Sequence, residues 1–533
     1  MSLSERDTKA NDSTDIEFSG ITSRQAVAQV YQELLVDQAS QPDKIFIGSH
    51  DLKHLDPNFV ALDEDTQEHP RSWPIAKKVR ATAIVGGCCF LSPFASTIFA
   101  PSIHLVMKDL AITDSTVGAL QVSIFLFALA LGPLFIAPLS EKYGRAATIH
   151  FGNFFFVAFS LGGGFSQTAA QFSVCRLFAG FGGSASIAVL GGFVTDVWDL
   201  AARPKASGLV MLGPVLGPVL GPVCGGWMSE RVSWRWTLWI PAIASALLST
   251  AGLFFLPESF APRVLQTKLQ RERKTNLSAE LYTVLDLQHR PTGPAALINA
   301  FIRPLAYLVL DPALLLASLF YSVVFGVVYL IIVTYADVFG VGYGHSVGIV
   351  GTDFRAAGIG MLVGTFATIR AMEAIFKRDT ASGQTKYKPE SRLISCLVGG
   401  TLLVGGLFMY GFTATRTHFI VPLVAIMLMM AGGMNIQLAL QLYAIDAFKF
   451  PASAVAAISF LRCMFAGAFP LFGEKLFAKL GLDWGVGLLG FSVLAVGLPL
   501  ILLLYIYGAK LRAKGAERME RSKVRKQPRS SVY

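Results

Sequence analysis

Twelve long, largely apolar segments constrain the fold of this chain more than any other feature of its sequence. They lie at about residues 81–103, 116–138, 147–167, 171–195, 206–228, 236–257, 311–336, 347–369, 393–414, 418–445, 453–473 and 485–508. About 20 apolar residues in a helix span the hydrocarbon core of a bilayer. Only 15% of the residues are charged, whereas about a quarter are charged in soluble domains. The sequence therefore predicts an all-α protein that crosses a membrane twelve times.

The twelve segments form two sets of six, which predicts two pseudo-symmetric helical bundles. We place the bundles at residues 76–257 and 311–508, with a polar cytoplasmic loop at 258–310 between them. The acidic segment 1–75 is predicted to be a largely disordered N-terminal tail, and the basic segment 509–533 a C-terminal tail.

A faint repeat supports two equivalent halves. The fourth segment ends in "GGFVTDVW" and the tenth in "LYAIDAF", which places Asp196 and Asp446 at matching ends. Six spans, a basic loop and six spans is the arrangement of a transporter with two related halves. A receptor or a membrane enzyme can share this architecture, so the motifs have to decide.

The distribution of Lys and Arg predicts the topology. These residues concentrate in alternate loops and in the C-terminal tail, which indicates that both ends are cytoplasmic. The same pattern accounts for the net charge of +10 without a nucleic-acid partner. The six cysteines lie in apolar segments without the spacing of metal ligands, so we predict no metal site. We expect a multi-pass protein of the plasma membrane, with the vacuolar membrane as the alternative.

The stretch "VMLGPVLGPVLGPVCGGWM", residues 210–228, repeats a Gly-Pro pair every four residues. Glycines four residues apart drift slowly along one helix face and let another helix approach closely. Each proline removes a backbone hydrogen bond and bends the helix. The stretch therefore predicts a packing seam on a helix that flexes between two bundle faces. The residues concerned are Gly213, Pro214, Gly217, Pro218, Gly221, Pro222, Gly225 and Gly226.

Motifs along the chain resemble those of the major facilitator superfamily, in the branch of fungal twelve-span drug:proton antiporters. The Gly-Pro stretch resembles the antiporter motif of the fifth span. "APLSEKYGRA" resembles motif A after the second span, and "RLFAGFGGS" resembles motif B in the fourth. "SWRWTLWI" and "PESFAPRVL" around the sixth span, and "FLRCMFAGAFPLF" in the eleventh, resemble the same branch. The resemblance implies the twelve-helix fold, a small-molecule substrate and proton exchange, with no cofactor.

Motif A predicts an inner gate. Its candidate residues are Glu141, Lys142, Gly144 and Arg145. Gly144 permits a tight turn, and Asp196 at the same membrane face is the predicted partner of Arg145. The alternative is a solvated loop that is anchored by its positive charges. The chain departs from the family in having alanine at residues 137 and 146.

Two arginines lie inside predicted spans, where a charge near the helix centre costs about 2.5–3.5 kcal/mol. The resemblance implies a part in proton coupling for Arg176, and the alternative is that its side chain snorkels to the outer interface. Arg462 lies too deep to snorkel, so it requires Asp446, a carbonyl or an anionic substrate group as a partner. No Asp or Glu lies in the middle of a span. The proton-coupling candidates are therefore Arg176, Asp196, Asp446 and Arg462.

Polar and aromatic side chains of the seventh and tenth spans are candidates for a substrate cavity. They are Tyr321, Tyr329, Asn435, Gln437 and Gln441. Buried amides need hydrogen-bond partners, so three of them on one span indicate water or a polar neighbour. Packing is the alternative for the aromatic residues.

These features predict a secondary transporter and not an enzyme. We expect it to export small amphipathic compounds, such as drugs, toxins, secondary metabolites or polyamines, by proton antiport with alternating access. The expected partners are the lipid bilayer, the substrate and protons, and we expect a monomer. The chain has no G-x-x-x-x-G-K-[ST] run, so ATP is not expected to supply the energy. A facilitator or proton-coupled importer is one alternative, and a membrane sensor that moves no solute is another.

Overall fold

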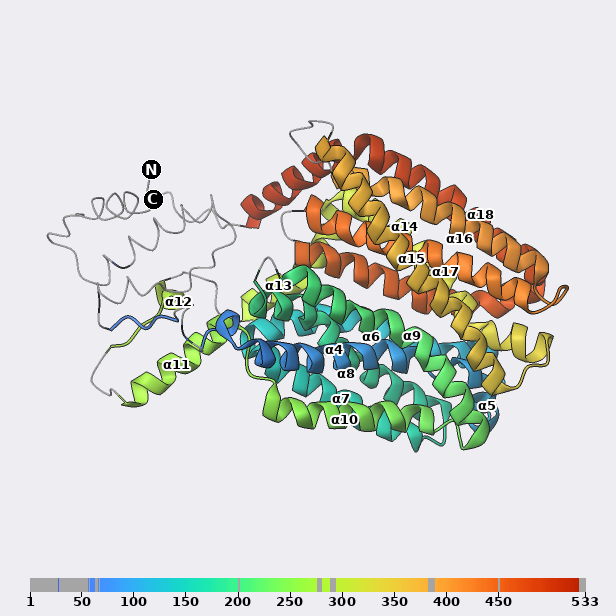
Figure 1. The fold of residues 1–533 in the computed structure, drawn as a ribbon, viewed down its shortest axis with the longest axis horizontal. Helices are drawn as coiled ribbons and strands as arrows, with labels where there is room; N and C mark the ends of the chain where they lie inside the picture. Colours follow the sequence, from blue (N-terminus) through green and yellow to red (C-terminus); the bar gives the residue numbers. More distant parts are fainter. Residues whose placement is uncertain are drawn as a thin grey trace. The chain divides into compact units, whose positions relative to one another are not determined.

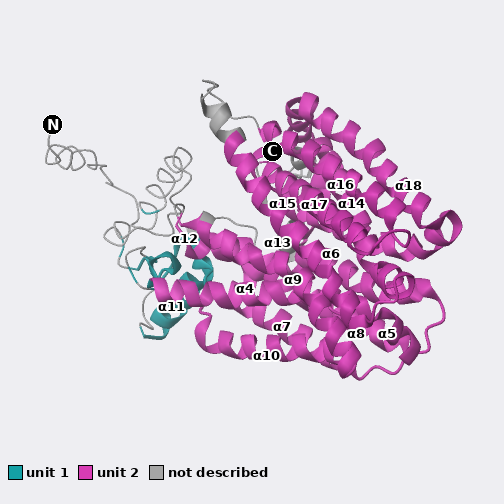
Figure 2. Cartoon of the chain, turned by 45° about the vertical axis from the view of Figure 1, so that its right-hand side comes forward, with its two compact units in different colours: residues 1–74, 258–291 teal, residues 75–257, 292–533 magenta. Residues whose placement is uncertain are grey.

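The structure, a computed structural model, describes residues 27, 56, 58–62, 66, 68–199, 202–275, 280–287, 294–381, 389–448 and 451–526. Most of the predicted N-terminal tail and the end of the predicted C-terminal tail lie outside these residues. The chain divides into two compact units (Figure 2). The larger unit contains residues 75–257 and 292–533, and the smaller contains residues 1–74 and 258–291.

The larger unit consists of packed helices, and eleven helices among the described residues are long and apolar enough to cross a membrane (Figure 1). This confirms the predicted all-α membrane fold. Its first half contains α4 (Ile75–Thr97), η2 (Ala100–Ser102), α5 (Ile103–Asp109), α6 (Ser115–Tyr143), α7 (Arg145–Gly164), α8 (Ala169–Val197), α9 (Arg203–Arg231) and α10 (Trp236–Phe255).

The second half contains α14 (Pro312–Val333), the π-helix η3 (Ala336–Gly342), α15 (Val347–Ala381), η4 (Pro389–Arg392), α16 (Leu393–Thr413), α17 (Ile420–Ala447) and α18 (Pro451–Lys526). Helix α13 (Pro294–Leu310) precedes it and packs against α6, α14 and α18. Residues 294–310, which belong to the predicted loop of residues 258–310, form this helix and are part of the larger unit. Helices α4 and α14 begin, and α10 stops, at the same end of the larger unit, which we name the inner end. The opposite end is named the outer end.

Helix α18 accounts for two of the twelve predicted spans. Its apolar part, Ser453–Arg521, is 69 residues long. At 1.5 Å per residue this would be several times the roughly 30 Å of a bilayer core. The helix turns back at Gly481, whose φ of 73° is the left-handed conformation that glycine adopts without strain. Gly485 lies against the ring of Phe477, which places the residues on either side of the turn in contact.

The smaller unit brings part of the predicted N-terminal tail together with the chain between the halves. It contains η1 (Pro70–Ser72), α11 (Ala261–Thr275) and α12 (Val284–Leu287). Phe59 forms a β-bridge with Tyr282, whose hydroxyl donates to Asp56 over 2.9 Å. Apolar residues of the two segments share a small core, formed by Val60, Leu62, Leu265, Leu269 and Leu281. These described residues of the tail are therefore packed, which the acidic composition does not indicate.

Two pairs of helices join the halves of the larger unit. Helix α6 packs against α18, and α9 packs against α15. A Cβ on Gly467 of α18 would lie 2.6 Å from the ring of Phe127 on α6. A Cβ on Gly351 of α15 would lie 2.5 Å from the carbonyl oxygen of Pro222 and 3.1 Å from the Cα of Gly226, both on α9. The seam between the halves thus depends on small residues that allow close helix approach.

The Gly-Pro helix α9 lies between α4 of its own half and α15 of the other half. A Cβ on Gly217 would lie 2.8 Å from the backbone nitrogen of Phe94, and one on Gly221 would lie 2.7 Å from the carbonyl oxygen of Phe94. The glycine face is therefore filled by the backbone of α4, with Gly225 against the carbonyl oxygen of Ile98. The predicted seam is present. Helix α9 remains continuous through its three prolines.

The close contact of α9 with α4 predicts the effect of a single added methyl group. We expect Gly225→Ala to lower the free energy of unfolding by about 1–3 kcal/mol, because the new Cβ would overlap the Ile98 carbonyl oxygen. Thermal unfolding of the purified protein in detergent measures this loss. Gly208→Ala is the matched control, since nothing lies within 4 Å of a Cβ at that position of the same helix. Equal destabilisation by both changes would contradict the assigned contact.

Candidate functional site

Arg176 lies near the outer end of α8 and is only 2% exposed. Its guanidinium donates to the carbonyl oxygens of Ala95 (2.9 Å), Ser96 (3.4 Å) and Gln121 (3.3 Å). The alternative in which this side chain snorkels to the outer interface is therefore wrong. Residues 95 and 96 belong to the last turn of α4, whose carbonyls lack partners within the helix. A buried cation is favourable at the negative end of a helix dipole.

Two aromatic rings complete the surroundings of Arg176. Its guanidinium carbon lies 4.5 Å from the ring centre of Phe99 and 4.4 Å from that of Phe125. Such contacts contribute about 2 kcal/mol when they are desolvated. No carboxylate of the described residues pairs with Arg176. Carbonyls and rings therefore stabilise this charge, and the arginine fastens α8 to α4 and α6.

Arg462 lies about three turns into α18 and has a different environment. Its Nη1 donates to the hydroxyl of Tyr321 over 3.3 Å. The guanidinium carbon lies 4.6 Å from the ring centre of Phe325 and 5.6 Å from that of Tyr321. Within the described parts of the chain no Asp or Glu pairs with it. The alternative in which Asp446 neutralises Arg462 is wrong, because Asp446 lies at the inner end and pairs with another arginine.

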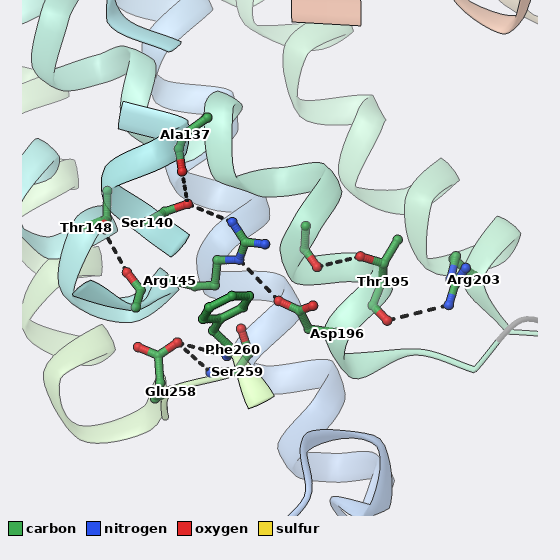
Figure 3. Close-up of polar contacts among 12 residues, drawn as sticks. Ala137, Ser140, Arg145, Thr148, Thr195, Asp196, Arg203, Glu258, Ser259 and Phe260 are labelled. Atoms are coloured by element: carbon green, nitrogen blue, oxygen red, sulfur yellow. Dashed lines mark hydrogen bonds and ion pairs between the residues drawn. The ribbon is translucent and has the colours of Figure 1, made fainter. Parts of the chain in front are cut away.

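Motif A brings three side chains together at the inner end of the first half (Figure 3). Gly144 joins α6 to α7 with a φ of 103°, a conformation that few other residues adopt. Arg145 Nε lies 3.2 Å from Asp196 Oδ2 at the end of α8, and Arg145 Nη1 donates to Ser140 over 2.6 Å. The guanidinium also lies against Gly192, where a Cβ would be 2.5 Å away. The predicted pairing of Arg145 with Asp196 is therefore present.

The second half contains a matching ion pair. Arg392, directly before α16, contacts Asp446 near the end of α17, with Nε and Nη2 at 2.7 Å and 2.6 Å from Oδ2. The same helix ends are joined here as in the pair of Arg145 with Asp196. Our sequence analysis did not identify Arg392. The internal repeat was the available signal, because it matches Asp196 with Asp446.

The other two charged residues of motif A do not join this pair. Glu141 and Lys142 are both exposed. The ammonium of Lys142 lies 5.1 Å above the ring of Tyr143. In the part of the chain that the structure describes, neither residue forms an ion pair, so only Arg145 of the predicted charged gate residues contacts Asp196.

Two polar contacts join the halves at the outer end. His104 of α5 lies 2.9 Å from Asp337 of η3, measured from Nε2 to Oδ1. Glu230 of α9 accepts a hydrogen bond from the backbone N–H of Gly348 over 2.5 Å, at the N-terminus of α15. Carboxylates are favourable at such helix ends. These partners could not be predicted from the sequence, because the residues lie far apart in the chain.

A third outer contact stiffens the start of α15 within the second half. His345 Nδ1 lies 2.7 Å from Asp353 Oδ2, and the hydroxyl of Tyr335 donates to the carbonyl oxygen of Asp353 over 2.9 Å. The carboxylate of Asp353 is thus already engaged. Among the described residues no group of His, Cys, Asp and Glu could hold a metal ion.

The predicted cavity residues separate into three groups. Tyr321 and Tyr329 are buried on α14, and Tyr321 contacts Arg462. Gln437 and Gln441 are partly exposed and lie one turn apart on α17. Asn435 is buried and accepts a hydrogen bond from Ser395 over 3.1 Å. It packs between α16 and α17, so its expected place in a substrate cavity is wrong.

Comparison with known proteins identifies the family. The Major Facilitator Superfamily profile matches residues 85–470. The chain is 37% identical over 462 residues to the efflux pump radE of Floropilus chiversii, which covers 86% of this chain and 85% of radE. It is 33% identical over 467 residues to the efflux pump vrtL of Penicillium aethiopicum, covering 87% of this chain and 92% of vrtL. The chain belongs to the Major Facilitator Superfamily.

Solved structures agree with this assignment at the level of the fold. The xylose transporter XylE from E. coli, in a partially occluded inward open conformation, matches with a TM-score of 0.57 at 15% identity. The match covers 81% of this chain and 98% of XylE. A bacterial homologue of the human lysosomal transporter Spinster matches with a TM-score of 0.53 at 14% identity, covering 84% and 94% of the two chains. The protein is a membrane transporter.

The two inner ion pairs predict a measurable coupling energy. We expect double-mutant cycles of Arg145→Gln with Asp196→Asn, and of Arg392→Gln with Asp446→Asn, to give about 1–3 kcal/mol each, because these side chains are at most about a quarter exposed. The measurement is the free energy of unfolding.

The control for these cycles is the pair of Glu517 and Arg521 on α18, whose side chains are 59% and 78% exposed. Such a pair is expected to give at most about 0.5 kcal/mol. Coupling in the inner pairs no larger than in this control would contradict the structural importance of the pairs.

Proposed function

We propose that the protein is a secondary active exporter that moves small amphipathic compounds, such as drugs, toxins or secondary metabolites, across the membrane in exchange for protons. The relatives support export, since radE of Floropilus chiversii and vrtL of Penicillium aethiopicum are both named efflux pumps. We place both termini in the cytoplasm and the protein in the plasma membrane, on the distribution of its Lys and Arg residues.

The contacts between the two halves are the basis for proposing alternating access. Along the middle of the seam, α9 and α15 approach through small residues, which lets the two helices rock against each other there. At the outer end the halves meet through His104 with Asp337 and through Glu230 with Gly348. Such side-chain contacts can break and re-form within one transport cycle. We assign them to an outer gate that is closed in this conformation.

The inner ion pairs are our candidates for the inner gate and for proton coupling. Asp196 and Asp446 each hold an arginine at the start of the neighbouring helix. Protonation of a carboxylate removes its charge and weakens its hold on the arginine. Coupling of this kind lets a proton gradient bias the gate. Glu141 and Lys142 are exposed and lie outside the pairs, and we assign them a role only in the solvated part of motif A.

In this proposal Arg176 contributes to proton coupling by fixing the position of the end of α4. It holds the outer turn of α4, and His104 of the outer gate follows that turn by seven residues. A change in the hydrogen bonds of Arg176 would therefore move the gate. Arg176→Lys keeps the charge but loses the geometry that lets one guanidinium reach three carbonyls. We expect this variant to transport at about one tenth of the normal rate or less.

Proton exchange is tested with the purified protein in liposomes that contain a pH-sensitive dye. A panel of azoles, polyamines and fungal metabolites is added under an imposed pH gradient. We expect substrate-dependent movement of protons in the direction opposite to the substrate. Asp196→Asn is expected to reduce it about tenfold, whereas the nearby exposed Asp199 can be changed to Asn with little effect. Movement of labelled substrate with a silent dye under every gradient would indicate a facilitator and overturn the antiport.

The outer gate is tested by joining its two sides. A short bis-maleimide linker between cysteines placed at residues 104 and 337 should arrest transport, because the native side chains there are 2.9 Å apart. Each single-cysteine variant, treated in the same way, is the control for the six native cysteines. Full transport by the cross-linked protein would show that the outer contact does not open during the cycle.

Two other functions fit the fold less well. A facilitator or a proton-coupled importer would use the same helices, and the Gly-Pro repeat of α9 is the feature that favours the antiporter. A sensor that binds a solute without moving it would show binding to the purified protein and no flux in liposomes. The dye experiment separates all three.

A further inference from the structure

We propose that Arg462 binds an anionic group of the transported compound, so that the preferred substrates are amphipathic acids. This inference rests on the proposed function of the protein as an exporter. It concerns what the site selects, and it can fail while the export itself stands.

Arg462 carries a charge that the protein does not neutralise. In the described ranges of the chain its polar contact is the hydroxyl of Tyr321, and its remaining close neighbours are the rings of Phe325 and Tyr321. Three carboxylates at helix ends already have partners. Asp196 and Asp446 hold arginines at the inner end, and Asp353 contacts His345 at the outer end.

The guanidinium also keeps hydrogen-bond donors open. An arginine has five N–H donors in a planar fork that matches a carboxylate. Arg462 uses Nη1 for Tyr321. Neither Nε nor Nη2 donates to a described residue. Both atoms keep some accessible surface, since they are not among the fully buried polar atoms without a partner. Arg462 is only partly buried, so these two groups remain accessible, and they form the side of the fork suited to bidentate binding.

Arg176 shows what a structural arginine in this protein looks like. Its Nε, Nη1 and Nη2 all donate to carbonyl oxygens, and two rings cover its faces. The chain can thus give each nitrogen of a buried arginine a carbonyl partner. Arg462 keeps donors without a partner among the described residues, which is expected of a group whose positive charge binds an anionic ligand.

The position of Arg462 suits capture from the inner side. Leu126 of α6, Tyr329 of α14 and Ala466 of α18 form an apolar cluster where the two halves meet. Arg462 lies one turn before Ala466 on α18, toward the inner end of the helix. Phe325 packs against this cluster and also lies under the guanidinium. A compound with an acidic group and an apolar body could therefore place the first on Arg462 and the second against these rings.

The experiment compares matched compounds. Four scaffolds (naphthyl, indolyl, biphenyl and decyl) are each supplied as the carboxylic acid and as the uncharged primary amide of the same size. Efflux is measured in proteoliposomes with the full-length protein. We expect the acids to be transported at least about tenfold more efficiently than the amides by the wild-type protein. A tenfold preference corresponds to 1.4 kcal/mol.

Variants of Arg462 locate the preference. Arg462→Gln should lose the preference for acids while amide transport changes less than about twofold, and Arg462→Lys should retain part of the preference. Arg370→Gln is the matched control, because Arg370 is an exposed arginine of α15 in the same half. Thermal unfolding of the Arg462→Lys and Arg462→Gln proteins checks that both are folded. Replacing chloride by gluconate tests whether an inorganic anion occupies the arginine.

The outcomes are distinct. Transport of acids and amides with equal efficiency, or an unchanged preference in Arg462→Gln, would overturn the inference and leave the exporter intact. Loss of acid and amide transport together in folded Arg462→Lys and Arg462→Gln proteins would make Arg462 structural. A dependence on chloride that disappears in Arg462→Gln, without acid preference, would make chloride its counter-ion. If the wild-type protein moves none of these compounds and none of the wider panel, the proposed export itself fails.

Discussion

The cost of placing a charge in hydrocarbon governs the polar architecture of this protein. Within a bilayer each charged side chain needs a partner or must lie at a helix end. The described carboxylates follow this rule, since the inner ends hold Asp196 and Asp446 and the outer ends hold Glu230, Asp337 and Asp353. Polar contacts that respond to movement therefore lie at the two faces of the membrane. Between these faces the helical unit relies mainly on packing, and Arg462 is its deeply placed charge.

Packing in the middle is set by backbone proximity. The glycines of α9 allow the backbone of α4 to fill one face, while Gly226 and the neighbouring proline carbonyl meet α15 on another. Proline in this helix lowers the number of internal hydrogen bonds, and the helix remains continuous because neighbouring helices support it. Helix α9 thus packs closely against α4 of the first half and also contacts α15 of the second. Rigid halves with a compliant seam are what a rocking movement requires.

Much of this arrangement could be predicted from the sequence, because the bilayer reduces folding to a one-dimensional pattern. Hydropathy located the spans, and the repeat matched Asp196 with Asp446. The pairing of Arg145 with Asp196 followed from their common membrane face. Contacts between distant segments were not predictable in the same way. Arg392 and the outer pair of His104 with Asp337 depend on how helices rotate about their axes, which hydropathy does not encode.

Two differences from the sequence analysis have a related physical origin. Amides attract water, but the amide oxygen of Asn435 accepts its hydrogen bond from a serine one helix away. The alternative of an interfacial Arg176 fails because the last carbonyls of α4 lie nearer. In both cases a neutral partner in the packed protein replaced the solvent that sequence reasoning assumed. Single-sequence patterns describe what a side chain needs and not which neighbour supplies it.

The reversal of α18 at Gly481 bears on how the chain enters the membrane. The two spans on either side of this glycine have almost no connecting segment, since the residues that flank the turn already touch. The two spans are therefore joined by a turn and not by a loop. We expect the two spans to insert together as a helical hairpin, late in biosynthesis, when the remaining spans have already formed the surface on which the hairpin docks.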